Sequence, residues 1–186
     1  MDDVKRKVAK WHNMNISFLK EINSLVQEIK VSESLQIICY FTYSFNISHM
    51  RGNDNFCLGS FHLYNNGGKP LQNPYICIKL SSNSSFEFSG KYVYKDSKQK
   101  INLVDTWERI NDPKDKQEYW LKPNNLQELN PLETLSFSDF QIKWSPESSY
   151  TGSILGFVYG DELKEGISSL NQINVSGQVD EGDMNE

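Results

Sequence analysis

LQIICYFTYSFNI, residues 35–47, places an apolar residue at every second position. Six apolar residues share one parity: Ile37, Cys39, Phe41, Tyr43, Phe45 and Ile47. The opposite parity carries the polar residues Gln36, Thr42, Ser44 and Asn46. Because successive side chains of a β-strand point to opposite faces, this stretch predicts a long strand with one buried face.

Strand-like patterns return in six later stretches. They are NFCLGSFHLYNN (55–66), NPYICIKLSS (73–82), FEFSGKYVYK (86–95), EYWLK (118–122), LETLSFSDFQIKW (132–144) and SYTGSILGFVYG (149–160). We expect residues 86–95 to form one strand with Phe86, Phe88, Tyr92 and Tyr94 on one face. A change of parity near Ser138 and Asp139 predicts a β-bulge. About seven short strands with a helix only in front predict a mainly β protein, an antiparallel immunoglobulin-like β-sandwich.

Residues 1–30 contain no Pro or Gly, and their apolar positions recur every three or four residues, which predicts an amphipathic helix. The heptad seam has Val8, Asn15, Ile22 and Ile29 at a, and Val4, Trp11, Phe18 and Leu25 at d. A lone Asn at a fixes register and oligomer state in parallel coiled coils. The pattern therefore favours a self-association surface that includes Trp11, Asn15, Phe18 and Ile22. The alternative is a helix packed on its own sandwich, with Leu19 and Val26 widening the apolar stripe.

The length of 186 residues suits one domain with an appendage. We expect the helix over 1–32, the sandwich over 33–172 and an acidic, disordered tail over 173–186. Within residues 96–117, DTWERINDP predicts a short helix in a charged loop, with Asp105 as N-cap and Pro113 past its end. There Trp107 and Arg109 are candidate binding residues at the surface. Trp120 and Trp144 are expected in the core.

Charge and cysteine usage limit the partners. The net charge of −5 and a pI near 5.3 oppose binding to nucleic acid or to an anionic membrane. The first fifteen residues carry charges where a signal peptide needs an apolar run, so we expect a cytoplasmic protein. Three cysteines, Cys39, Cys57 and Cys77, lie within apolar strands and are expected to be buried and reduced.

No catalytic, cofactor or metal site is expected from the sequence. The three histidines lack zinc-ligand spacing, and no nucleophile elbow or phosphate-binding loop occurs. Asp161 and Glu162 are interpreted as turn residues. The favoured function is a non-enzymatic interaction or assembly module, whose partner is another protein or a second copy. A carbohydrate-binding module is the alternative, and a hydrolase with a dispersed site is a further one.

Three stretches resemble a known family. LGSFHLYNNGGKPLQNPYICIKL (58–80), LNPLETLSF (129–137) and GSILGFVYG (152–160) are together similar to immunoglobulin-like domains of the bacterial CARDB and fibronectin type III kind. Asn66, Gly67 and Gly68 match the turn that follows the second strand of that family. Residues 129–133 match its late hydrophobic-x-Pro-Gly-Glu turn, with Leu132 in place of the usual Gly. The resemblance covers residues 35–160 and implies a sandwich fold.

Overall fold

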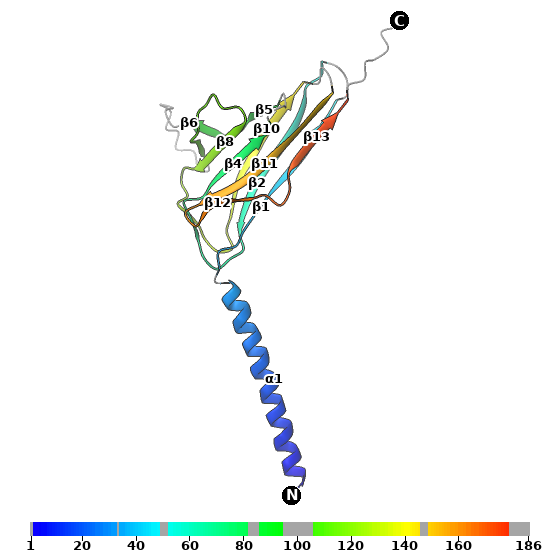
Figure 1. Ribbon diagram of the computed structural model, residues 1–186, viewed down its shortest axis with the longest axis vertical. Coiled ribbons are helices and arrows are strands. Elements are labelled where there is room, and N and C mark those ends of the chain that lie inside the picture. Colours follow the sequence, from blue (N-terminus) through cyan, green and yellow to red (C-terminus); the bar gives the residue numbers. More distant parts are fainter. Residues whose placement is uncertain are drawn as a thin grey trace.

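The described part of the chain forms one long helix and two large β-sheets that face each other (Figure 1). The computed structural model describes residues 2–32, 34–48, 52–81, 86–94, 106–145 and 149–178. Helix α1, Asp2–Ser32, extends away from the sheets, and its N-terminus lies at the far end (Figure 1). The predicted front helix is confirmed.

The first sheet has four antiparallel strands in the order β1-β2-β10-β5. They are β1 (Ile37–Asn46), β2 (Asn55–Asn65), β10 (Thr134–Trp144) and β5 (Glu87–Ser89). β1 and β2 pair without interruption, from Ile37 opposite Asn65 to Asn46 opposite Phe56. The alternating stretch at residues 37–46 therefore forms an edge strand.

The second sheet has the order β12-β11-β4-β8-β7-β6, and β13 also pairs with β11. Its strands are β4 (Tyr75–Leu80), β6 (Tyr92–Tyr94), β7 (Trp107–Arg109), β8 (Glu118–Pro123), β11 (Tyr150–Gly160), β12 (Leu163–Ser168) and β13 (Ile173–Gly177). All pairs are antiparallel except β6 with β7. A small third sheet joins β3 (Leu71–Gln72) to β9 (Glu128–Leu129).

One apolar core lies between the two large sheets. A Cβ at Gly156 of β11 would lie 2.8 Å from Cζ of Phe41, a residue of the opposite sheet, so the sheets approach closely there. Trp144 is buried as expected, with 2% of its surface exposed. The mainly β, antiparallel sandwich is thus confirmed.

The expected β-bulge is present in β10. The register with β2 shifts between Phe137 and Phe140, and Asp139 has a φ of 59°. The extra residue changes the parity of the strand, which lets both Phe137 and Phe140 point into the core with no exposed surface.

Two local predictions are wrong. Residues 86–95 do not form one strand: β5 and β6 belong to different sheets, and Tyr94 is 42% exposed. The chain changes sheet at Gly90, where the ring of Phe137 occupies the space of a Cβ. The helix predicted at DTWERINDP is instead strand β7, whose Trp107 pairs with Pro123 of β8. Asp105, the predicted N-cap, lies outside the described residues.

Two strands on one side of the sandwich, β13 and β1, also depart from expectation (Figure 1). β13 lies inside the range 173–186 that the sequence assigned to a tail, yet Ile173 and Val175 are buried in the core. Pairing with β11 buries these two side chains, although the range 173–186 as a whole is polar and acidic. β1, on the same side of the sandwich (Figure 1), buries only the first half of its apolar face: Phe41 is 3% exposed, whereas Tyr43 is 41% exposed.

Candidate interaction site

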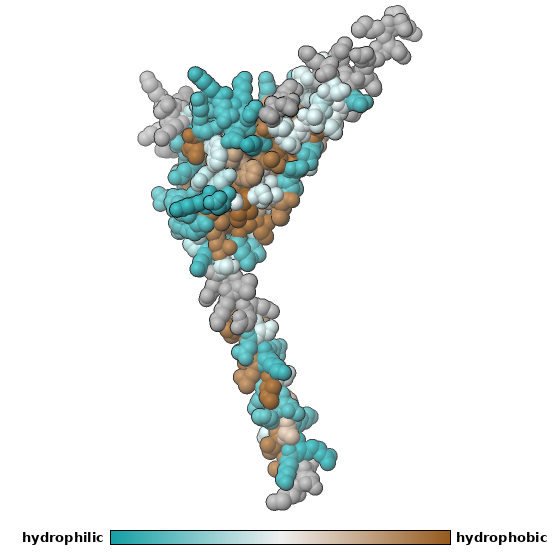
Figure 2. All heavy atoms as spheres, viewed as in Figure 1, coloured by the Kyte–Doolittle hydropathy of each residue, from teal (hydrophilic) through white to brown (hydrophobic). Residues whose placement is uncertain are grey.

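The apolar seam of α1 is uncovered. All described side chains from Val4 to Val26 are exposed, and apolar residues line the helix along its length (Figure 2). Trp11 is 67% exposed, Phe18 55% and Ile22 54%. The alternative in which the helix packs on its own sandwich is therefore not the arrangement found in this structure.

Asn15 lies in the middle of this seam and is exposed. Residues spaced by three or four lie on the same side of a helix, so Trp11 and Phe18 flank Asn15 on that side. A stripe of this kind can bury apolar area against another helix. One basic group, made of Lys5, Arg6, Lys7 and Lys10, lies in its first third.

Trp107 and Arg109 lie inside the molecule, and the prediction of a surface site at this loop is wrong. Trp107 is 3% exposed and packs edge-on against Phe137, with ring centroids 5.5 Å apart. Arg109 is 4% exposed, and its guanidinium lies 4.3 Å from the ring centroid of Tyr119. Neither side chain can reach a partner without unfolding of this part of the sheet.

Arg109 instead ties a loop to the sheet. Its Nε donates to Oδ1 of Asn111 at 3.0 Å. Its Nη2 donates to the backbone carbonyls of Asp112, Asp115 and Glu118. A buried guanidinium needs such acceptors, because an unpaired charge in the interior is costly. The role of Arg109 is structural.

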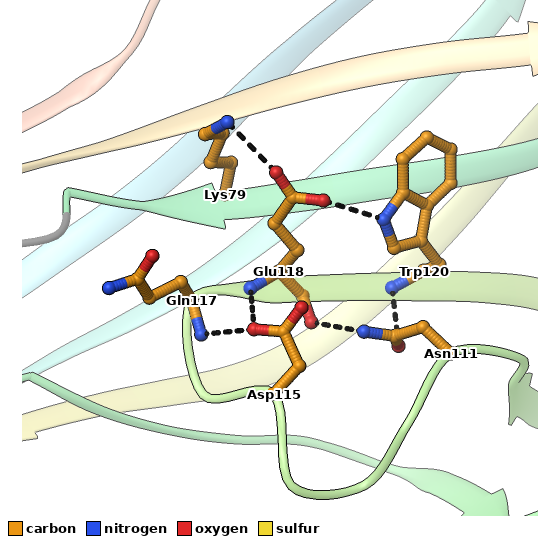
Figure 3. A network of polar contacts seen from close by, with 6 residues as sticks. All are labelled: Lys79, Asn111, Asp115, Gln117, Glu118 and Trp120. Carbon is orange, nitrogen blue, oxygen red and sulfur yellow. Dashed lines mark hydrogen bonds and ion pairs between the residues drawn. The ribbon is translucent and has the colours of Figure 1, made fainter.

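Asp115 and Glu118 form a polar network with their neighbours (Figure 3). Asp115 accepts hydrogen bonds from the backbone N–H groups of Gln117, at 2.8 Å, and Glu118, at 3.0 Å, and these lower its pKa. Glu118 accepts from Lys79 Nζ at 2.8 Å and from Trp120 Nε1 at 2.9 Å. The Lys79 contact is the main cause that lowers the pKa of Glu118. Hydrogen bonds favour the ionised form of both carboxylates, which suits a structural role.

Trp120 lies on the outer face of the second sheet, half-buried, and its predicted place in the core is wrong. Its ring centroid is 5.1 Å from that of Tyr159 and 6.1 Å from that of Tyr75. The two tyrosines stack with centroids 5.2 Å apart. Sequence reasoning missed both tyrosines, although each has the outward parity in its strand, opposite Ile76 and Val158.

The three thiols of the sandwich are buried. Cys39, Cys57 and Cys77 are buried and free, as predicted, and burial raises the pKa of each thiol to about 12. Asp161 and Glu162 accept hydrogen bonds from Asn73 and Gln72, which fits their interpretation as turn residues. The described residues contain no group of three His, Cys, Asp or Glu that could hold a metal ion.

A cavity of about 600 Å³ beside Trp107 and Pro123 has Lys91 in its lining, and that amine pairs with Asp139 at 2.7 Å. Among the described helical residues, none belongs to a helix long and apolar enough to span a membrane. The exposed seam of α1 is therefore the main candidate site, and the ring cluster around Trp120 is the second.

No protein-family model matches the sequence, and no curated protein matches it. Among solved structures, the chain is similar to two of a GH20 exo-β-N-acetylglucosaminidase from Vibrio harveyi, one in complex with N-acetylglucosamine and one of an inactive mutant. Each likeness spans 75% of this chain and 17% of the enzyme chain, at 9% identity and a TM-score of 0.29. A likeness this weak carries no argument about function.

Proposed function

We propose that the protein is a non-enzymatic assembly module that self-associates through α1. The observation that carries the proposal is the exposed seam itself. Six residues of the seam are each more than half exposed, although a continuous apolar stripe is normally covered: Val4, Val8, Trp11, Phe18, Ile22 and Leu25. A second copy of the helix offers a matching stripe, because a coiled-coil surface is complementary to itself.

Asn15 favours a parallel arrangement. In parallel copies the two Asn15 side chains meet at one level, where their amides can bond to each other. In antiparallel copies a residue at a faces one at d, so each Asn15 amide lies against an apolar side chain such as Phe18. The parallel pair therefore satisfies a polar group that the antiparallel pair leaves without a partner.

The charges of α1 allow the two arrangements to be separated. Parallel copies bring Lys5, Lys7 and Lys10 of both helices to the same end, where they repel. Antiparallel copies place Lys7 toward the half of the partner that carries Glu21. Since salt screens exposed charges, higher ionic strength should strengthen a parallel assembly and weaken an antiparallel one.

Sedimentation tests the proposal. We expect the full chain to form oligomers at about 100 μM, well above a micromolar dissociation constant. Ile22→Asp should make it monomeric, because a charge enters the seam. Ile16→Asp is the matched control, since Ile16 is 40% exposed but lies outside the seam, at a b position. A monomeric wild-type chain at this concentration would remove the self-association reading.

A second candidate function is carbohydrate binding at the cluster of Tyr75, Trp120 and Tyr159. The observation in its favour is a set of three partly exposed rings on one sheet face, beside the Lys79–Glu118 pair. Aromatic faces bury apolar area, and the pair at the rim supplies a donor and an acceptor. Titration with a panel of soluble oligosaccharides should then change the fluorescence of the wild type but not of Trp120→Ala. Trp11→Ala is the control that keeps the cluster.

A further inference from the structure

β1 presents an open backbone edge to the solvent. It is the outermost strand of the first sheet, so only one of its sides pairs with β2. In an antiparallel pair the N–H and C=O groups of successive residues point alternately toward and away from the partner strand. The carbonyl of Cys39 accepts a hydrogen bond from the N–H of Leu170. The backbone N–H and C=O groups of the odd-numbered residues of β1 therefore point away from β2.

Asn171 shows what this edge binds. Its side-chain Oδ1 accepts from the backbone N–H of Phe41 at 2.7 Å, and its Nδ2 donates to the carbonyl of Phe41 at 2.9 Å. A primary amide with one donor and one acceptor on the same residue imitates the peptide group of a neighbouring strand. The segment that contains Leu170 and Asn171 thus covers β1 as far as Phe41.

Beyond Phe41 the edge is uncovered. The next residues whose backbone groups point away from β2 are Tyr43 and Phe45, about 6.8 Å apart along the strand. Within the described part of the chain, no strand pairs with this side of β1. β1 carries no charged residue and no proline, the usual protections of an edge strand. Among the described residues, the outward backbone groups of Tyr43 and Phe45 therefore have no strand partner, and β1 has no charge or proline that would deter pairing.

The side chains at this position also lack cover. Tyr43, Phe45 and Ile47 have the core-facing parity, yet they are 41%, 38% and 38% exposed. The ring of Phe45 contacts that of Trp144, with centroids 6.4 Å apart. Trp144 is 2% exposed, and among the described residues its Nε1 has no hydrogen-bond partner. This end of the sandwich combines an open edge, exposed rings and an unpaired buried donor.

We propose that the open edge of β1 at Tyr43–Asn46 binds an extended segment of a partner polypeptide by β-strand addition. Backbone groups of the incoming strand bond to Tyr43 and Phe45, and its apolar residues at alternate positions cover the exposed rings. A second copy is the poorer occupant. If two copies are joined by parallel helices, they are related by a two-fold axis along α1, and their β1 strands then run in the same direction. Antiparallel pairing of two copies of this edge requires strands that run in opposite directions.

The probe is a display library of ten-residue peptides with Val, Ile, Phe or Tyr at alternate positions and any residue between them. We expect the full chain to select binders from it. Tyr43→Pro should weaken the selected peptide about tenfold, because it removes one outward N–H donor. The β1–β2 ladder does not use this N–H, so an edge strand tolerates Pro here. Tyr43→Ala, which keeps the donor, is the matched control and should retain more affinity.

N-methylation of the peptide provides a second measurement that does not depend on folding of a variant. Methyl groups on every second backbone nitrogen should abolish binding in one parity and spare it in the other. Absence of any selected peptide, equal binding to Tyr43→Pro, or equal loss from both methylated parities would overturn the proposal. It would also be overturned if a chain with Trp11→Asp and Phe18→Asp still dimerised and Tyr43→Pro dissolved that dimer, since a second copy would then occupy the edge.

Discussion

Two tryptophans of this chain allow the same substitution to be made in opposite environments. Trp107 is 3% exposed inside the sandwich, and Trp11 is 67% exposed on α1. We expect Trp107→Ala to destabilise folding without a specific effect on assembly. Trp11→Ala should weaken assembly and leave the sandwich intact. Each variant is the matched control of the other.

The magnitudes follow from burial. Truncation of a buried Trp to Ala costs about 3–5 kcal/mol, because the ring contacts are lost and a cavity remains. The contact of Trp107 with Phe137 at 5.5 Å belongs to this loss. For a domain of this size, about 3–5 kcal/mol lowers the melting temperature by roughly 6–20 °C. Trp11→Ala should change the stability of the sandwich by less than about 0.5 kcal/mol.

For assembly we expect the opposite order: Trp11→Ala should have a large effect and Trp107→Ala no specific one. A large ring at the centre of an interface typically contributes about 2 kcal/mol or more, so Trp11→Ala should raise the dissociation constant about thirtyfold. Thermal unfolding followed by circular dichroism measures the first effect, and sedimentation equilibrium measures the second. If Trp107→Ala melted within 2 °C of the wild type, or if Trp11→Ala associated as tightly as the wild type, the assignment of the two rings would be refuted.

Four further changes test other parts of the structure. Asn15→Ile should raise oligomer stability and broaden the oligomer state in sedimentation, and an unchanged, single oligomer would argue against an amide pair at this position. Gly156→Ala should cost about 1–3 kcal/mol in urea unfolding, because its Cβ meets the rings of Phe61 and Phe41; a neutral result would contradict the close approach of the sheets. Asp115 has a lowered pKa, so its stabilising effect is present above pH 3.8 and is lost as the pH falls further. Asp115→Asn should therefore be less stable than the wild type at pH 7, and this difference in stability should shrink below pH 3.8. The buried thiols have pKa values raised from 9.0 to about 12, so the stability of the fold should decrease as the pH rises from 9 toward 12. Labelling of the native protein by a bulky thiol reagent should be slow at pH 7, and rapid labelling at two sites would contradict the burial of the thiols.

Periodic patterns predicted most of the elements. The strand patterns of β1, β2 and β11 were correct, because alternation of side chains is a property of the backbone that needs no knowledge of the partner strand. The parity change before Phe140 identified the bulge for the same reason. The three- and four-residue spacing along α1 likewise identified the seam, and the structure leaves that seam exposed.

Short segments were predicted poorly, because their conformation depends on distant partners. Trp107 lies in a segment with a plausible N-cap and a terminating Pro113, yet pairing with β8 makes it a strand. β13 (INVSG) lies in a C-terminal stretch that is polar and acidic as a whole, and it becomes part of the sheet through β11. Local propensities amount to a fraction of a kcal/mol per residue, roughly 0.7 at most for ordinary residues, so sheet pairing and burial override them over a few residues.

The sequence by itself determined the long periodic elements: a helix with a polar residue in its apolar seam, and strands with one apolar face. Only the tertiary structure decided which apolar residues are covered. Phe41 and Phe45 have the same parity in one strand, but Phe41 is 3% exposed and Phe45 is 38% exposed. The difference goes with the contacts: Asn171 bonds to the backbone of Phe41 and Gly156 of β11 lies against its ring, whereas the ring of Phe45 contacts that of Trp144 and stays partly open to solvent. Periodicity states which side of a strand faces inward, whereas burial depends on atoms that come from elsewhere in the chain.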